Sequence, residues 1–199
     1  MEEKNGSKAG KAIAILFGVM FAGLLVYAVV ALSNKENAAS GETTTEQYYD
    51  DHGLSFTYPA GYVISTDDVE NGVVDVLCEV KGSDVSQIEF STVSMPGVEE
   101  FSRSEKEEVC CAALEGMKEE YKNTLLYRNV TFSSIQSGYL GKYPCYQMDI
   151  NVTILSVTSK GVAKVAITEG GQLIITVSLY ENEKYKNTLE KIEQSINLQ

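Results

Sequence analysis

The feature that most constrains this chain is a run of 21 uncharged residues near its start, Ala12 to Leu32, which reads AIAILFGVMFAGLLVYAVVAL. At ~1.5 Å per residue, a helix of this length spans roughly 30 Å, the thickness of the hydrocarbon core of a bilayer. A cleavable signal peptide has a shorter apolar core and a small-residue cleavage site, which Val29-Val30-Ala31 would supply. We interpret residues 12–33 as an uncleaved transmembrane helix, and cleavage is the alternative.

The lysines around this run predict its orientation. Lys4, Lys8 and Lys11 precede it, whereas Lys35 alone follows it closely. Basic residues stay on the cytoplasmic side of a span. We therefore expect a single-pass protein of the cell membrane, with residues 1–11 in the cytoplasm and the C-terminal part extracytoplasmic.

Small residues inside the run suggest a contact between helices. Ala14, Gly18 and Ala22 fall four residues apart and would share one helix face. Such a stripe lets a second helix approach closely, so a dimer through the transmembrane helix is one expectation. Small residues are also common in membrane spans that do not pair.

The remainder divides into a linker and one domain. Residues 34–52 lack apolar periodicity and are rich in Thr, Glu and Ala, which predicts a flexible linker. Residues 53–199 have the size of one ordinary domain with its own core. The net charge of −12 makes a partner with a phosphate backbone unfavourable, so we expect no nucleic acid.

Period-two alternation predicts an antiparallel sheet in this domain. Residues 146–154, YQMDINVTI, place Tyr, Met, Ile, Val and Ile on one face, and residues 172–180 alternate in the same way. Turn residues separate the two, so 144–180 is predicted to be a three-stranded meander. Further strands are predicted at 54–58, 62–65, 73–80, 86–94 and 127–135.

Two amphipathic helices interrupt the strands. Residues 103–123 carry an apolar stripe, and Ser104 with Glu107 has the spacing of a capping box. Residues 182–198 carry a second stripe. Each stripe needs a sheet face to cover, which predicts an α+β fold with an antiparallel sheet sandwiched between two amphipathic helices, preceded by the transmembrane helix.

Two stretches resemble a known family. LSFTYPAGYVIS (54–65) is similar to the opening hairpin of PsbP/Mog1-like domains, although Tyr62 stands where that family often has Trp. GGQLIITVSLY (170–180), followed by an amphipathic helix that ends in SINL (195–198), resembles their close. The resemblance covers about 53–198. It implies an antiparallel sheet between helices and a role in binding partner proteins or assisting assembly, and it transfers no active-site residue.

The cysteines and the lone histidine do not predict a metal site. Cys78, Cys110, Cys111 and Cys145 lack the close spacing of zinc ligands, and His52 is the only histidine. An extracytoplasmic location permits disulfides. Four cysteines allow three pairings, and the sequence does not choose between them. A disulfide between Cys78 and Cys145 would be the least strained, and buried free thiols are the alternative.

No motif for catalysis or for a cofactor is complete. DDVENG (67–72) begins like a calcium loop, but Val69 and Cys78 occupy positions that need oxygen ligands. The segment around Gly141-Lys142 lacks the residues of a phosphate loop. We therefore expect no cofactor, no metal and no enzymatic activity.

The tyrosines supply the candidate contact residues. Tyr139 and Tyr143 flank the Gly141-Lys142 turn and could contact a partner, or they could be ordinary hairpin aromatics. The sequence as a whole predicts a membrane-anchored extracytoplasmic interaction or assembly module with an unknown protein partner. The alternative is a domain that binds a glycan or small ligand through tyrosine-lined loops.

Overall fold

The computed structural model describes residues 45–198, apart from 70–72, 82, 84 and 155. Three predicted features lie outside the described residues. They are the predicted cytoplasmic segment, the predicted transmembrane helix with Ala14, Gly18 and Ala22, and most of the predicted linker. None of the helices within the described ranges is long and apolar enough to cross a membrane.

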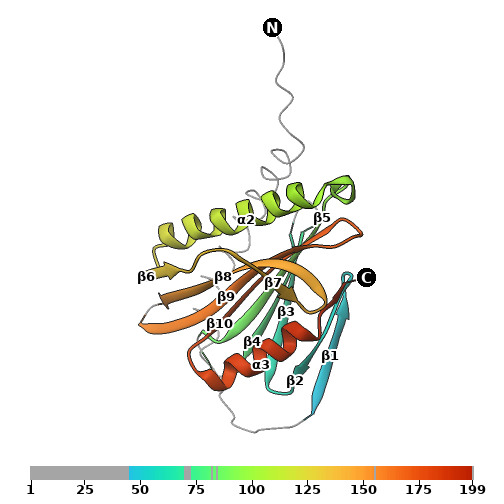
Figure 1. Ribbon diagram of the computed structural model, residues 1–199. Coiled ribbons are helices and arrows are strands. Elements are labelled where there is room, and N and C mark those ends of the chain that lie inside the picture. Colours follow the sequence, from blue (N-terminus) through green and yellow to red (C-terminus); the bar gives the residue numbers. More distant parts are fainter. Residues whose placement is uncertain (1–44, 70–72, 82, 84, 155, 199) are drawn as a thin grey trace.

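The main body is an antiparallel sheet of eight strands (Figure 1). Its order is β3-β4-β5-β10-β9-β8-β6, and β7 also pairs with β8. The strands are β3 (Tyr62–Val69), β4 (Val73–Val80), β5 (Gln87–Ser94), β6 (Tyr127–Phe132), β7 (Gln136–Leu140), β8 (Tyr143–Ile154), β9 (Val157–Ile167) and β10 (Gln172–Tyr180). The predicted meander is confirmed as β8-β9-β10.

A second, three-stranded sheet joins the two ends of the domain. β1 (Glu46–Asp51), β2 (Leu54–Pro59) and β11 (Asn197–Leu198) pair in the order β1-β2-β11. The prediction of a flexible linker was therefore wrong for residues 46–51, where the Tyr49 ring stacks on Phe56 with centroids 5.0 Å apart.

The helices pack on opposite faces of the main sheet (Figure 1). A short 3-10 turn, η1 (Val98–Glu100), precedes α2 (Arg103–Asn123), which contacts β6, β8 and β9. α3 (Glu183–Gln194) contacts β10 and β2. The α+β sandwich is confirmed. The second helix, predicted to reach residue 198, ends at Gln194 because the chain then extends to pair with β2.

Helix α2 begins with a capping box, but not at the predicted residue. Ser102 is the N-cap: its Oγ accepts from the Glu105 N–H at 3.3 Å, and its N–H donates to the Glu105 carboxylate at 2.8 Å. Ser104 and Glu107 repeat the same spacing two residues later, so spacing alone could not choose between the two pairs.

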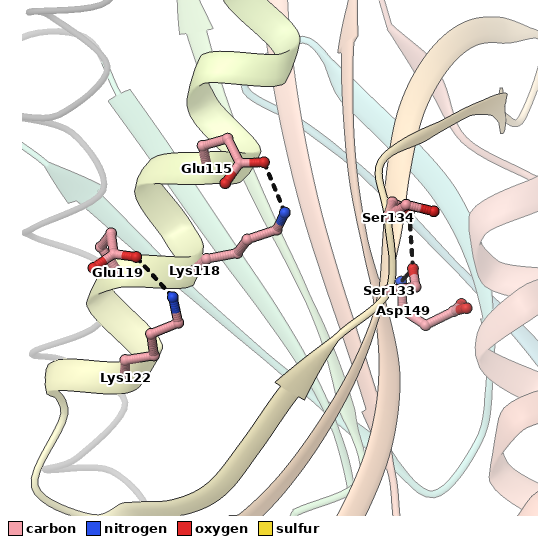
Figure 2. A network of polar contacts seen from close by, with 7 residues as sticks. All are labelled: Glu115, Lys118, Glu119, Lys122, Ser133, Ser134 and Asp149. Atoms are coloured by element: carbon pink, nitrogen blue, oxygen red, sulfur yellow. Dashed lines mark hydrogen bonds and ion pairs between the residues drawn. The ribbon is translucent and has the colours of Figure 1, made fainter.

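The outer face of α2 is polar and paired. Lys118 Nζ lies 2.7 Å from Glu115 Oε1, and Lys122 Nζ lies 2.8 Å from Glu119 Oε1. Figure 2 shows the two pairs on successive turns of the helix. Side chains three residues apart are neighbours on a helix surface, so these pairs support the exposed side. The opposite side of α2 is free to carry the apolar stripe.

Two buried clusters result from the two-sided sheet. Leu173, Ile175, Val177 and Leu179 of β10 lie in the cluster under α2, whereas Ile174 lies in the cluster under α3. The predicted inward face of β8 also lies under α2. Strand β10 is thus buried on both faces and forms the centre of the fold.

Candidate functional site

A groove of about 640 Å³ opens at one end of the main sheet. It is formed by three segments that are far apart in the sequence: the first turns of α2, the β7–β8 hairpin, and the connection from β9 to β10. The three segments meet because β7, β8 and β9 are neighbours in the sheet, and their ends lie beside the start of α2.

Strand β7 is held in place where it separates from β6. Both strands pair with β8, and the chain crosses from one to the other at residues 133–135 (Figure 2). The Ser133 N–H donates to the Asp149 carbonyl at 3.1 Å, and the Asp149 N–H donates to the Ser133 Oγ at 2.9 Å. The Ser133 hydroxyl donates in turn to the Ser134 carbonyl at 3.0 Å. This crossing fixes the position at which β7 begins.

The turn between β7 and β8 is fixed by its contact with the end of α3. Gly141 has φ 56°, which glycine adopts with little strain. A Cβ at this position would lie 3.1 Å from the Ile196 carbonyl and 3.3 Å from the Glu193 carbonyl. The end of α3 therefore packs directly on this turn and supports the groove from beneath.

The groove has an apolar floor with aromatic walls. Phe101, Tyr139, Pro144, Tyr146 and Ile167 line it. Tyr139 is 68% exposed, so its ring is available to a ligand. An exposed aromatic ring beside a partly buried apolar floor is typical of contact surfaces for other molecules.

Four charged side chains stand around this floor. Arg103 and Lys106 belong to the first turn of α2, and Glu107 and Glu169 complete the set. Partial burial raises the pKa of Tyr146, and the neighbouring Glu107 carboxylate adds to the effect. The groove therefore combines both signs of charge within an apolar setting.

Two cysteines also line the groove. Burial raises the pKa of Cys110 to about 12 and that of Cys145 to about 11. Both thiols are 3% exposed. Since the thiolate is the reactive form, thiols with such pKa values are poor nucleophiles at neutral pH.

The predicted disulfide is absent, because Cys78 and Cys145 are both free thiols. Cys78 lies on β4 and Cys145 on β8, with β5, β10 and β9 between them. Four strand spacings of ~4.8 Å separate them by roughly 19 Å along the sheet, whereas a disulfide needs Cα atoms within about 7 Å.

The two predicted contact tyrosines have different positions. Tyr139 lines the groove. Tyr143 is half-buried beside the C-terminal strand, where its hydroxyl accepts from the Leu198 N–H at 2.9 Å. Its ring packs against the cluster under α3, so Tyr143 has a structural contact inside its own domain.

Sequence reasoning missed Phe101, Arg103 and Lys106 as members of the site. Their signal was weak, since Arg103 and Lys106 have the spacing of any polar helix face. Within the part of the chain that the structure describes, no three His, Cys, Asp or Glu side chains are grouped so that they could hold a metal ion.

One main antiparallel sheet with α2 on one face and the C-terminal helix α3 on the other is the arrangement of a PsbP-like fold. The solution structure of cyanobacterial PsbP (CyanoP) from Synechocystis sp. PCC 6803 matches with a TM-score of 0.56 and 14% identity. The match covers 83% of this chain and 99% of that chain. The expected PsbP/Mog1-like fold is thus confirmed.

Two further solved structures are similar to this chain. A crystal structure from Bacteroides thetaiotaomicron matches with a TM-score of 0.51 and 9% identity, over 77% of this chain and 48% of that chain. LpqN, described as involved in cell envelope biogenesis of Mycobacterium tuberculosis, has a TM-score of 0.47 and 12% identity, over 77% of this chain and 90% of that chain. No family model and no curated protein matches the sequence.

Proposed function

We propose that this chain is a membrane-anchored extracytoplasmic module that binds a partner protein through the groove. The observation that carries the proposal is the groove itself, which presents an exposed tyrosine and a pair of cations over an apolar floor. The predicted transmembrane helix at 12–33 would hold the folded body outside the cell, and the acidic sequence suits a solvated external domain.

The anchoring can be tested on intact cells. A protease added from outside should digest the C-terminal body and leave a protected N-terminal fragment that contains residues 12–33. Full-length protein that withstands external protease, in cells where a known external protein is digested, would refute the topology. A mature protein that begins after Ala31 would refute the anchor.

The interaction can be tested by crosslinking in the native membrane. A photoreactive phenylalanine analogue at Tyr139 should give one dominant crosslinked protein, because this side chain lies at the groove. The matched control places the same analogue at Leu125, which is 95% exposed and follows the far end of α2. Equal crosslinking patterns at both positions would refute the groove as the contact surface.

A glycan or small ligand is the second candidate, and one observation favours it. Tyr139 and Tyr146 both line the groove, and aromatic faces stack on sugars. Tyr139→Ala should then abolish binding to cell-wall glycan in a sedimentation assay. Retention of protein crosslinks together with absence of glycan binding would decide for the first candidate.

A further inference from the structure

Strand β7 presents one side that is unoccupied by other strands. Within the described residues it pairs with β8 alone, since β6 takes the other half of the same β8 edge. Gln136, Ser137 and Tyr139 are exposed. The Tyr139 carbonyl accepts from the Lys164 Nζ at 3.4 Å, and Lys164 belongs to β9, on the other side of β8.

The register indicates which backbone groups face outward. Leu140 and Tyr143 flank the two-residue turn, so they form a hydrogen-bonded pair, and bonded and non-bonded pairs alternate from there. Gly138 therefore bonds to β8, whereas the N–H and C=O groups of Ser137 and Tyr139 point away from it. Pro144 agrees with this pattern, since it has no N–H and stands opposite Tyr139.

This edge lacks the usual protection against pairing. Natural proteins place charges or proline on exposed edge strands to block the addition of another chain. The outer strand β1 follows that rule, with Glu46, Asp50 and Asp51 exposed along it. Strand β7, QSGYL, has neither a charge nor a proline.

The groove lies beside the same edge and would receive side chains. Ser137 and Tyr139 contribute to its wall, and Arg103 and Lys106 face it from α2. Neither cation has an ion-pair partner in the described ranges, unlike Lys118 and Lys122 further along the helix. Glu107 and Glu169 line the same groove, so the attraction is local: an acidic ligand group is favoured beside Arg103 and Lys106, at the start of α2.

We propose that β7 is a docking edge, to which an extended segment of the partner protein adds as a further strand. Apolar side chains at alternate positions of the segment enter the groove, and a carboxylate of the segment faces Arg103 and Lys106. Backbone bonds to Ser137 and Tyr139 supply affinity, and the pockets between α2 and β7 supply sequence preference. This inference rests on the proposed function, since it names the partner's chemistry at the same groove.

A displayed library of ten-residue peptides, panned on the full-length protein in detergent micelles, provides the probe. The enriched peptides should alternate apolar residues and contain an acidic residue. Ser137→Pro removes an outward N–H and should weaken the best peptide at least tenfold. Leu125→Pro, in the exposed turn that follows α2, is the matched control and should keep wild-type affinity. Arg103→Glu with Lys106→Glu should also weaken binding at least tenfold.

A second measurement tests the proposal even if Ser137→Pro perturbs the fold. N-methylation of the peptide at alternate residues should abolish binding at the positions that pair with β7 and leave the intervening positions unaffected. Absence of enriched peptides, a peptide that tolerates every N-methyl group, or self-association of the protein through β7 in sedimentation would overturn the proposal. A partner that crosslinks at Tyr139 while Ser137→Pro has no effect on peptide binding would leave the proposed function standing and remove this inference.

Discussion

Lys164 on β9 forms an ion pair with Glu193 on α3 that is almost closed to water, with the two side chains 14% and 4% exposed. Burial raises the pKa of Glu193, and the Lys164 charge opposes that rise. Lys164 also approaches the Tyr139 carbonyl. One cation thus connects α3, the centre of the sheet and the edge of the groove.

We expect Lys164→Met to destabilise the protein strongly, by about 3–5 kcal/mol, because it leaves a buried carboxylate without its partner. The double variant Lys164→Met/Glu193→Leu should recover most of this loss. Urea unfolding at neutral pH measures both. The deficit of the single variant should also shrink in acid, where Glu193 takes up a proton. Equal stability of the single and double variants would contradict this account.

Glu89 predicts a dependence of stability on pH. Burial, with Asp75 nearby on β4, raises the pKa of Glu89 to about 8. The unfolded value is about 4.3, so between these values the folded protein holds a proton that the unfolded chain lacks, and stability falls as the pH rises. Glu89→Gln should gain up to about 5 kcal/mol relative to wild type above pH 8 and nothing below pH 4.

The measurement for Glu89 is urea unfolding across pH 4 to 9. Glu108→Gln, at an exposed position on α2, serves as the control and should keep the wild-type slope. If Glu89→Gln keeps the full wild-type slope of unfolding free energy against pH, another group causes the pH dependence.

The capping box predicts a difference between two serines. Ser102→Ala removes the side chain that caps α2 and should cost about 1 kcal/mol. Ser104→Ala, inside the helix and exposed, should change stability by less than about 0.5 kcal/mol. Thermal unfolding of the two variants compares them directly. A larger loss of stability for Ser104→Ala than for Ser102→Ala would instead support the capping box that the sequence predicted, at Ser104 and Glu107.

Gly161, in the middle of β9, lies too close to the backbone of β10 to accept a side chain. A Cβ added there would lie 2.0 Å from the Ser178 carbonyl oxygen, which belongs to the backbone of the neighbouring strand β10. Gly161→Ala should therefore destabilise by about 2–4 kcal/mol, since two central strands must separate. Gly170→Ala is the control, because its nearest atom would be 3.9 Å away. Similar unfolding midpoints for the two variants would contradict the close approach.

The sequence predicted the strands and helices that carry clear apolar periodicity. Strands such as β8 and β10 alternate over nine or more residues, and the stripe of α2 identified its full length. β1 and β7 were missed for a physical reason. EQYYDD is half charged and QSGYL is short, and both form because an existing strand offers hydrogen bonds.

The groove could not be predicted because its walls meet only in three dimensions. Arg103, Tyr139 and Glu169 come from three segments that no local pattern connects. Tyr139 was identified by its place beside a turn, but Tyr143 has the same local setting and packs inward against Leu198. The difference arises from the C-terminal strand, which covers one tyrosine and leaves the other exposed.

The small sheet β1-β2-β11 determines how the domain would respond to mechanical tension. The described chain enters the domain at β1, so a pull from the N-terminal side would first load the hydrogen bond from the Ala60 N–H to the Thr45 carbonyl, and then the pairing of Glu46 with Pro59 at the open end of the β1–β2 hairpin. That hairpin would separate one residue pair at a time. If the chain is anchored as proposed, β1 would therefore detach before the strands that form the groove.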